Sequence, residues 1–135
     1  MHAFAAAEIP AETIWSEILG PLLTTEQVQS LMGPDSRQAV GDLARKSRIL
    51  VLDGSNGRNL FPSFQFDPEG QPYSVMAKVV TVFSEVVETP YTIASWFVSP
   101  QDLLDGETPV AWMRSQKDPS RLLAAAKRSA GELTL

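Results

Sequence analysis

Residues 24–48 read TTEQVQSLMGPDSRQAVGDLARKSR, and they contain the clearest local pattern of the chain. Thr25 to Met32 has the apolar spacing of a short helix, and Thr24 and Gln27 have the spacing of a capping box at its start. A turn follows at Gly33-Pro34-Asp35-Ser36, where glycine and proline interrupt the helical pattern. A second helix is expected over Arg37 to Arg48. Two short helices joined by such a turn are typical of a helix-turn-helix.

The second helix carries the candidate DNA contacts. Val40, Leu43 and Ala44 form its expected buried stripe. Arg37 and Gln38 lie outward at its start, where arginine can pair with guanine and glutamine with adenine. Basic residues near its end suit phosphate contacts. The full candidate set is Ser36, Arg37, Gln38, Arg45, Lys46, Arg48 and, on the following hairpin, Arg58.

Two outward residues of this helix oppose DNA binding. Gly41 weakens a helix interior by about 1 kcal/mol, and the carboxylate of Asp42 repels phosphate. The glycine fits either close approach to a backbone or a motif that no longer reads DNA. A purely structural helical hairpin therefore stays open as the alternative at this point.

A β-hairpin is expected directly after the second helix. The apolar run 49–52 and the run 58–61 flank Asp53-Gly54-Ser55-Asn56-Gly57, which has glycine where positive backbone angles are needed. In this position the hairpin is a wing that touches DNA with Asn56 and Arg58, or a cover that only shields the helices. Residues 61–67 alternate aromatic and polar positions, which predicts an edge strand with Pro62 tolerated at the edge.

Charge is distributed unevenly along the chain. The whole chain has a formal charge of −5, whereas residues 36–58 contain five basic and two acidic residues and therefore sum to +3. The remainder is −8. Screening limits each field to about 10 Å, so an acidic body with one basic face can bind phosphate locally. The modest local charge favours a dimer or larger assembly on DNA.

Helices are expected on both sides of this motif. Residues 11–23 predict an amphipathic helix with Ile14, Trp15, Ile18, Leu19 and Leu22 on one face, and Leu31 is expected inward on the next helix. Trp15 is either a core residue or an interface anchor. After the turn-rich segment 67–72, helices are expected near 75–86, 92–98, 110–114 and 120–132. We therefore predict a mainly α fold with two parts, residues 1–67 (helix-turn-helix and wing-like hairpin, for DNA) and residues 68–135 (a helical bundle).

Several functions are disfavoured by composition. The chain has no cysteine and one histidine, His2, so thiol chemistry, a histidine base and a metal site are not expected. Asp102, Asp105 and Glu107 are interpreted as helix caps and not as cation ligands. We expect no enzyme activity and no cofactor. Residues 1–7 lack the basic flank of a secretory signal and no apolar run is long enough for a membrane span, so a cytoplasmic protein is expected.

A family resemblance begins at Trp96 and extends through Pro109. The order of Pro100, Leu104, Gly106 and Pro109 resembles the toxin-binding domain of Xre/MbcA/ParS-type antitoxins. Upstream, the runs 36–40 and 61–67 resemble a helix-turn-helix and hairpin variant fused to that domain. The resemblance covers Thr24 to the end of the chain.

The resemblance implies an antitoxin of a type II toxin–antitoxin system. Such a protein covers the active-site cleft of a RES-domain toxin that consumes NAD, and it represses its own promoter. The implied partners are the toxin, operator DNA and a second copy of the chain, in a homodimer and a hetero-oligomer with the toxin. Candidate toxin contacts are Trp112, Arg114, Lys127, Arg128, Glu132, Leu133 and Leu135. The alternative is a helix-turn-helix regulator without a toxin partner.

Overall fold

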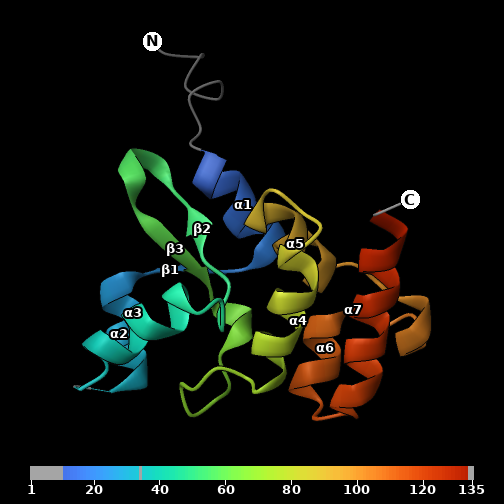
Figure 1. Cartoon of the computed structure of the whole chain (residues 1–135). Coiled ribbons are helices and arrows are strands. Elements are labelled where there is room, and N and C mark those ends of the chain that lie inside the picture. Colours follow the sequence, from blue (N-terminus) through green and yellow to red (C-terminus); the bar gives the residue numbers. More distant parts are fainter. Residues whose placement is uncertain (1–10, 34, 134–135) are drawn as a thin grey trace.

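The computed structural model describes residues 11–33 and 35–133, and its elements form two groups (Figure 1). The N-terminal group contains α1 (Ala11–Leu19), β1 (Leu22–Thr24), α2 (Thr25–Met32), α3 (Arg37–Arg45), β2 (Leu52–Asp53) and β3 (Asn59–Pro62). The C-terminal group contains α4 (Val75–Ser84), α5 (Pro90–Phe97), α6 (Pro109–Arg114) and α7 (Pro119–Leu133). No helix within the described residues is long and apolar enough to cross a membrane.

The three strands form one antiparallel sheet in the order β1-β3-β2. Leu23 is opposite Phe61 on one side of β3, and Leu52 is opposite Leu60 on the other. Along the chain, the helix-turn-helix of α2 and α3 lies between β1 and the β2–β3 hairpin. This is the order of elements in a winged helix. The predicted fold class, mainly α with a helix-turn-helix and a wing-like hairpin, is confirmed.

The first helix is shorter than predicted, and β1 was missed. Gly20, with a φ of +86°, ends α1, so Leu22 to Thr24 extend and pair with β3. The predicted buried face of this helix is also partly wrong, because Ile14 and Ile18 are 49% and 51% exposed. The helix instead packs through its neighbouring face, with Leu19 buried and Trp15 packed against the core.

Three further expectations were wrong around the helix-turn-helix of α2 and α3, called the reading motif below. Leu31 is 43% exposed and does not pack inward. The second helix ends at Arg45 because Ser47 adopts a left-handed backbone, with a φ of 55°. The predicted strand over residues 61–67 stops at Pro62, and a single 3-10 turn occupies Ser63–Gln65. β3 is also the central strand and not an edge.

Two hydrophobic clusters stabilise the molecule. The smaller one lies beneath α2 and α3 and contains Val28, Val40, Ile49, Phe61 and Phe66. The larger one joins N-terminal side chains such as Leu52 and Phe64 to the buried faces of α4 to α7. Packing is therefore continuous across residue 67, and the division into two functional parts stays a prediction about function.

The C-terminal helices begin at well-defined caps. Thr89 and Thr108 accept hydrogen bonds from the backbone N–H groups of Tyr91 and Ala111, and a proline follows each cap. At the start of α7, Asp118 accepts hydrogen bonds from the hydroxyl and the backbone N–H of Ser120. These hydrogen bonds, with the nearby Arg121 guanidinium, lower the pKa of Asp118. The cap is therefore negatively charged at neutral pH, at the helix end where the dipole favours an anion.

Candidate nucleic-acid interface

The reading motif is fixed by a complete capping box and a small apolar core. The backbone N–H of Thr24 donates to Gln27 Oε1 at 2.8 Å, and the backbone N–H of Gln27 donates to Thr24 Oγ1 at 3.2 Å. This confirms the predicted box at the start of α2. Val28 on α2 and Val40 on α3 are almost fully buried in the same cluster. Their packing fixes the angle at which α3 is presented.

Ser36 was predicted to contact DNA, and the structure places it elsewhere. Its side chain is only 6% exposed, and its hydroxyl lies 2.7 Å from both the Gln29 and the Gly33 carbonyl oxygens. The hydroxyl therefore holds the end of α2 and the turn together. Ser36 stabilises the motif, and its side chain is turned away from the surface that α3 presents.

The outward face of α3 is basic and accessible. Arg37 and Gln38 are the first two residues of the helix, and both are exposed. Arg45, Lys46 and Arg48 follow at its C-terminal end and are also exposed. Arg45 forms an ion pair with Asp42 one turn earlier. This pair neutralises the carboxylate that opposes phosphate binding, although it also engages the guanidinium of Arg45.

Gly41 lies on this face without any steric requirement for glycine within the chain. A Cβ at this position would meet only Arg45 Nη1, at 3.4 Å, and the backbone is helical. Since glycine weakens a helix interior, the fold of the chain alone does not account for it. A surface that must come close to another molecule would account for it.

The hairpin has the shape of a short wing. A 3-10 turn at Ser55–Gly57 joins β2 to β3, with Asn56 and Gly57 in left-handed conformations. The Gly54 N–H donates to the Arg58 carbonyl at 2.7 Å and closes the loop. Asn56 and Arg58 are exposed. Both candidate contacts of the hairpin are thus on its surface.

The base of the wing is attached to the C-terminal helices. The hydroxyl of Tyr91, on α5, donates to the backbone oxygen of Asp53 at 2.7 Å. The ring of Tyr91 lies against Trp15 of α1, with centroids 4.7 Å apart. Trp15 therefore packs within the chain, as its core interpretation predicts. The wing cannot move independently of α1 and α5 without breaking these contacts.

The predicted toxin contacts divide into accessible and buried residues. Arg114, Lys127, Arg128 and Glu132 are exposed, and Leu133 is 53% exposed. Trp112 is the correction: it is 4% exposed, and its indole Nε1 donates to the Asp118 carbonyl at 2.7 Å. Its ring supports the connection between α6 and α7 from inside. Leu135 and His2 lie outside the described residues.

The acidic residues predicted as caps mostly have another role. Asp105 pairs with Arg121 at 3.0 Å, and Glu107 pairs with Lys117. Both cations also lie over the Trp112 ring, at 5.0 Å for Lys117 and 5.5 Å for Arg121. The two carboxylates thus tie the 105–107 turn to the α6–α7 connection. Asp102 lies in the first turn of the 3-10 helix Asp102–Leu104.

Gln65 is the important residue that sequence reasoning missed. Its fully buried amide accepts from the Leu50 N–H at 2.7 Å and donates to the Leu50 carbonyl at 2.9 Å. Gln65 therefore supplies the two hydrogen bonds that a neighbouring strand would otherwise give to the segment between α3 and the wing. The alternation of Phe64, Gln65 and Phe66 suggested an outward glutamine, and no local signal marks this one as buried.

A comparison with solved structures found a similar overall fold. The NMR structure of Rv2175c is similar to this chain with a TM-score of 0.67, over 82% of this chain and 81% of that chain. The two sequences are 16% identical, so the likeness shows the fold alone. No protein-family model and no curated protein matches the sequence. The resemblance to Xre/MbcA/ParS-type antitoxins is not confirmed by these comparisons.

Proposed function

We propose that the protein is a sequence-specific DNA-binding regulator without catalytic activity or a cofactor. The observation that carries this proposal is the exposed, basic α3 at the second position of a winged helix-turn-helix. In such motifs the second helix enters the major groove and its N-terminal residues contact base edges. Arg37 and Gln38 occupy that place, and both have side chains suited to bidentate contacts with purines.

The remaining basic residues suit the DNA backbone. Arg45, Lys46 and Arg48 follow at the end of α3, and Arg58 lies on the wing. If these four neutralise one phosphate each, the logarithm of the binding constant should fall with the logarithm of salt concentration with a slope of about −4 per protomer. The acidic remainder of the chain would turn away from DNA and orient the approach.

A homodimer is part of the proposal. Ile14 and Ile18 are one helical turn apart on α1 and about half exposed, although isoleucine is usually buried. Pairing this face with its copy would bury both side chains. It would also present two copies of α3 to two half-sites, which raises affinity beyond that of four phosphate contacts.

The test of DNA binding is the double substitution Arg37→Ala, Gln38→Ala. The preferred DNA sequence is first selected from a random pool with the natural protein. We expect the double variant to bind this sequence with a free energy that is weaker by about 1–3 kcal/mol per bidentate contact. Fluorescence anisotropy measures this loss, and sedimentation of the free protein reports the dimer. Arg114→Ala with Gln71→Ala removes the same side-chain types from exposed positions away from α3 and should bind normally. Equal affinity of both double variants, or no enriched sequence at all, would contradict the proposal.

An antitoxin is the second candidate, and one feature of the C-terminal group favours it. A hollow of about 320 Å³ lies between α5 and the end of α7, bordered by Phe83, Trp96, Ser129, Glu132 and Leu133. It is continuous with the exposed residues Arg128 and Glu132, which were predicted to contact a toxin. An apolar hollow with a charged border suits a protein partner, here a RES-domain toxin.

Co-expression with the adjacent reading frame tests this second candidate. The neighbour should arrest growth alone, and the intact chain should relieve the arrest by forming a stable complex. Leu133→Lys should weaken the relief, because it places a charge at the apolar border, while Arg37→Ala with Gln38→Ala should leave it intact. A neighbour that is harmless alone would remove the antitoxin role and leave the DNA-binding role unaffected.

A further inference from the structure

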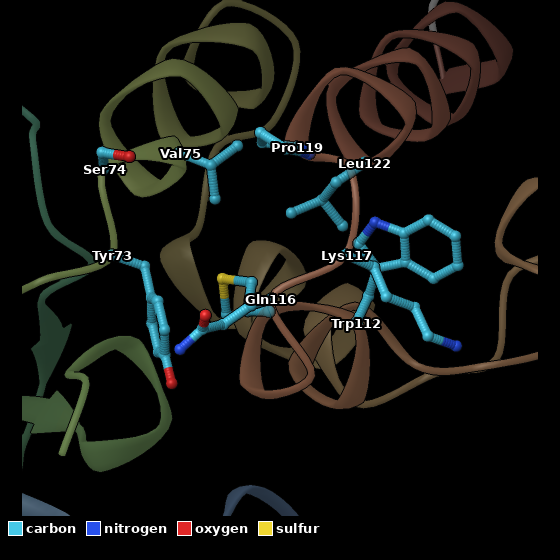
Figure 2. Close-up of a pocket in the computed structure, with 9 residues that line it drawn as sticks. Tyr73, Ser74, Val75, Trp112, Gln116, Lys117, Pro119 and Leu122 are labelled. Carbon is cyan, nitrogen blue, oxygen red and sulfur yellow. The ribbon is translucent and has the colours of Figure 1, made fainter.

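A cavity of about 220 Å³ opens between the start of α4 and the connection from α6 to α7 (Figure 2). Its walls are apolar and come from distant parts of the chain: Val75, Trp112, Met113, Pro119 and Leu122. Figure 2 shows Val75, Trp112, Pro119 and Leu122 around an open centre, with Tyr73, Ser74 and Gln116 at the border. Ligand sites are commonly apolar hollows with a few polar groups at the border.

A second hollow continues from the first. It has a volume of about 500 Å³, shares Tyr73, Ser74 and Gln116 with the cavity, and extends along Asp67, Pro68 and Glu69. Together the two form one groove with an apolar end and an acidic end. Neither end includes a residue of the proposed DNA contacts.

The charges of the groove select its ligand. At the apolar end Lys117 pairs with Glu107 and lies over the Trp112 ring, so its charge is already balanced. At the other end Asp67 accepts the backbone N–H groups of Glu69 and Gln71. Within the described part of the chain, no ion pair involves the carboxylate of either Asp67 or Glu69. The acidic end thus favours a cation, and the apolar end favours an aromatic ring.

We propose that this groove binds a small aromatic amine that regulates DNA binding. The ring would lie among Trp112, Met113 and Leu122, and the ammonium group would lie near Glu69. The regulatory part of this inference rests on the proposed DNA-binding function, whereas the binding part does not.

The loop at residues 67–73, which borders the groove, is linked to the helix-turn-helix along two routes. The Tyr73 N–H donates to the Gln65 carbonyl at 2.9 Å, and the Gln65 amide holds both backbone groups of Leu50, which follows α3. On the other side of the same loop, Gly70 packs so closely on Leu31 that a Cβ would lie 2.3 Å from the Leu31 oxygen. A ligand that moves residues 67–73 therefore acts on the end of α2 and on the segment after α3.

Binding is tested on the whole protein by methyl NMR with phenethylamine and tryptamine. A ligand of this size is expected to bind in about the millimolar range. Saturable shifts should appear at the methyl groups of Val75, Met113 and Leu122. Phenethyl alcohol should bind more weakly, and phenylacetate more weakly still. Glu69→Gln should weaken the amines about threefold to fivefold and leave the alcohol unchanged.

Ser74→Trp provides the matched blocked protein. Ser74 is exposed at the border of the cavity and its side chain makes no cap hydrogen bond to α4, so a larger side chain can close the opening with little effect on folding. The shifts should disappear in this variant. Absence of saturable shifts in the natural protein, or equal binding of amine and acid, would overturn the ligand assignment.

Two measurements test regulation. Together they distinguish a failure of regulation from a failure of the proposed DNA-binding function. Bound amine should shift the methyl groups of Leu31 and Leu50 in the free protein, and it should change affinity for the selected DNA about fivefold. Unmoved Leu31 and Leu50 signals with a saturated groove would overturn regulation, whether or not DNA binds. Shifted signals in a protein that selects no DNA sequence would refute the DNA-binding role and retain the groove as a ligand site that acts on the reading motif.

Discussion

Gly70→Ala is expected to lower the free energy of unfolding by about 3 kcal/mol or more. Gly70 has a φ of +83°, and a residue with a Cβ pays about 1–2 kcal/mol in such a left-handed conformation. The added carbon would also lie 2.3 Å from the Leu31 oxygen and 3.1 Å from its carbonyl carbon. Because the obstacle is backbone, the loop must move off the end of α2.

Gly106→Ala is the matched control for this prediction. Gly106 has the same φ of +83°, and a Cβ there would meet nothing within 4 Å. Its substitution should therefore cost only the conformational part, about 1–2 kcal/mol. Equilibrium unfolding in urea measures both variants. Equal losses would mean that the close approach between residue 70 and Leu31 does not hold this loop against α2.

The two glycines also show which of their properties can be predicted from the sequence. A glycine in a turn predicts a positive φ, and both Gly70 and Gly106 fit that rule. The close contact of Gly70 with Leu31 joins segments 39 residues apart along the chain. No local pattern contains that information. The groove beside this loop was missed for the same reason, since Tyr73 and Trp112 line one cavity only in the folded chain.

Signals that are local along the chain gave correct predictions. The Thr24–Gln27 box and the hairpin loop at residues 53–57 depend on neighbours within four residues, and both are present. The exposed positions of Arg37 and Gln38 followed from the 3.6-residue period of α3. The basic candidate face was therefore predictable, although its DNA-binding role stays a proposal.

Errors arose where tertiary pairing overrides a local preference. β1 has three residues, and only its pairing with β3 makes it a strand. Ile14 and Ile18 share a face with helical spacing, which predicts burial, but α1 packs through its Trp15 and Leu19 side. Ser36 was predicted to contact DNA, and its hydroxyl instead donates to two carbonyl oxygens beneath the turn.

Gln65→Glu should make folding stability depend on pH in a way that the natural protein does not. The amide is fully buried and uses both its oxygen and its nitrogen on Leu50. A protonated carboxyl group can reproduce both hydrogen bonds, because its hydroxyl donates to the carbonyl and its other oxygen accepts the N–H. An ionised carboxylate places a buried negative charge against the Leu50 carbonyl oxygen. Burial and this contact raise the pKa of the introduced group above its value in the unfolded chain.

The sign of the effect follows from that rise. Below the ordinary titration range of glutamate the group is protonated in both states, and the variant should be nearly as stable as the natural protein. As the pH rises, the unfolded chain loses its proton first, and stability falls by about 1.4 kcal/mol per pH unit. The loss should reach about 3–4 kcal/mol between about pH 4 and pH 7 if the raised pKa reaches neutrality.

Two further variants isolate the cause. Gln71→Glu adds the same group to an exposed position of the adjacent loop, so its stability relative to the natural protein should change little with pH. Gln65→Leu leaves both Leu50 groups without the amide and should lose about 2–4 kcal/mol at every pH. Urea unfolding of the natural protein and of the three variants across this pH range measures these differences in stability. A Gln65→Glu variant as stable at pH 7 as at pH 4, relative to the natural protein, would mean that water reaches residue 65. In that case the hydrogen bonds between Gln65 and Leu50 could not transmit a change from residues 67–73 to the segment after α3.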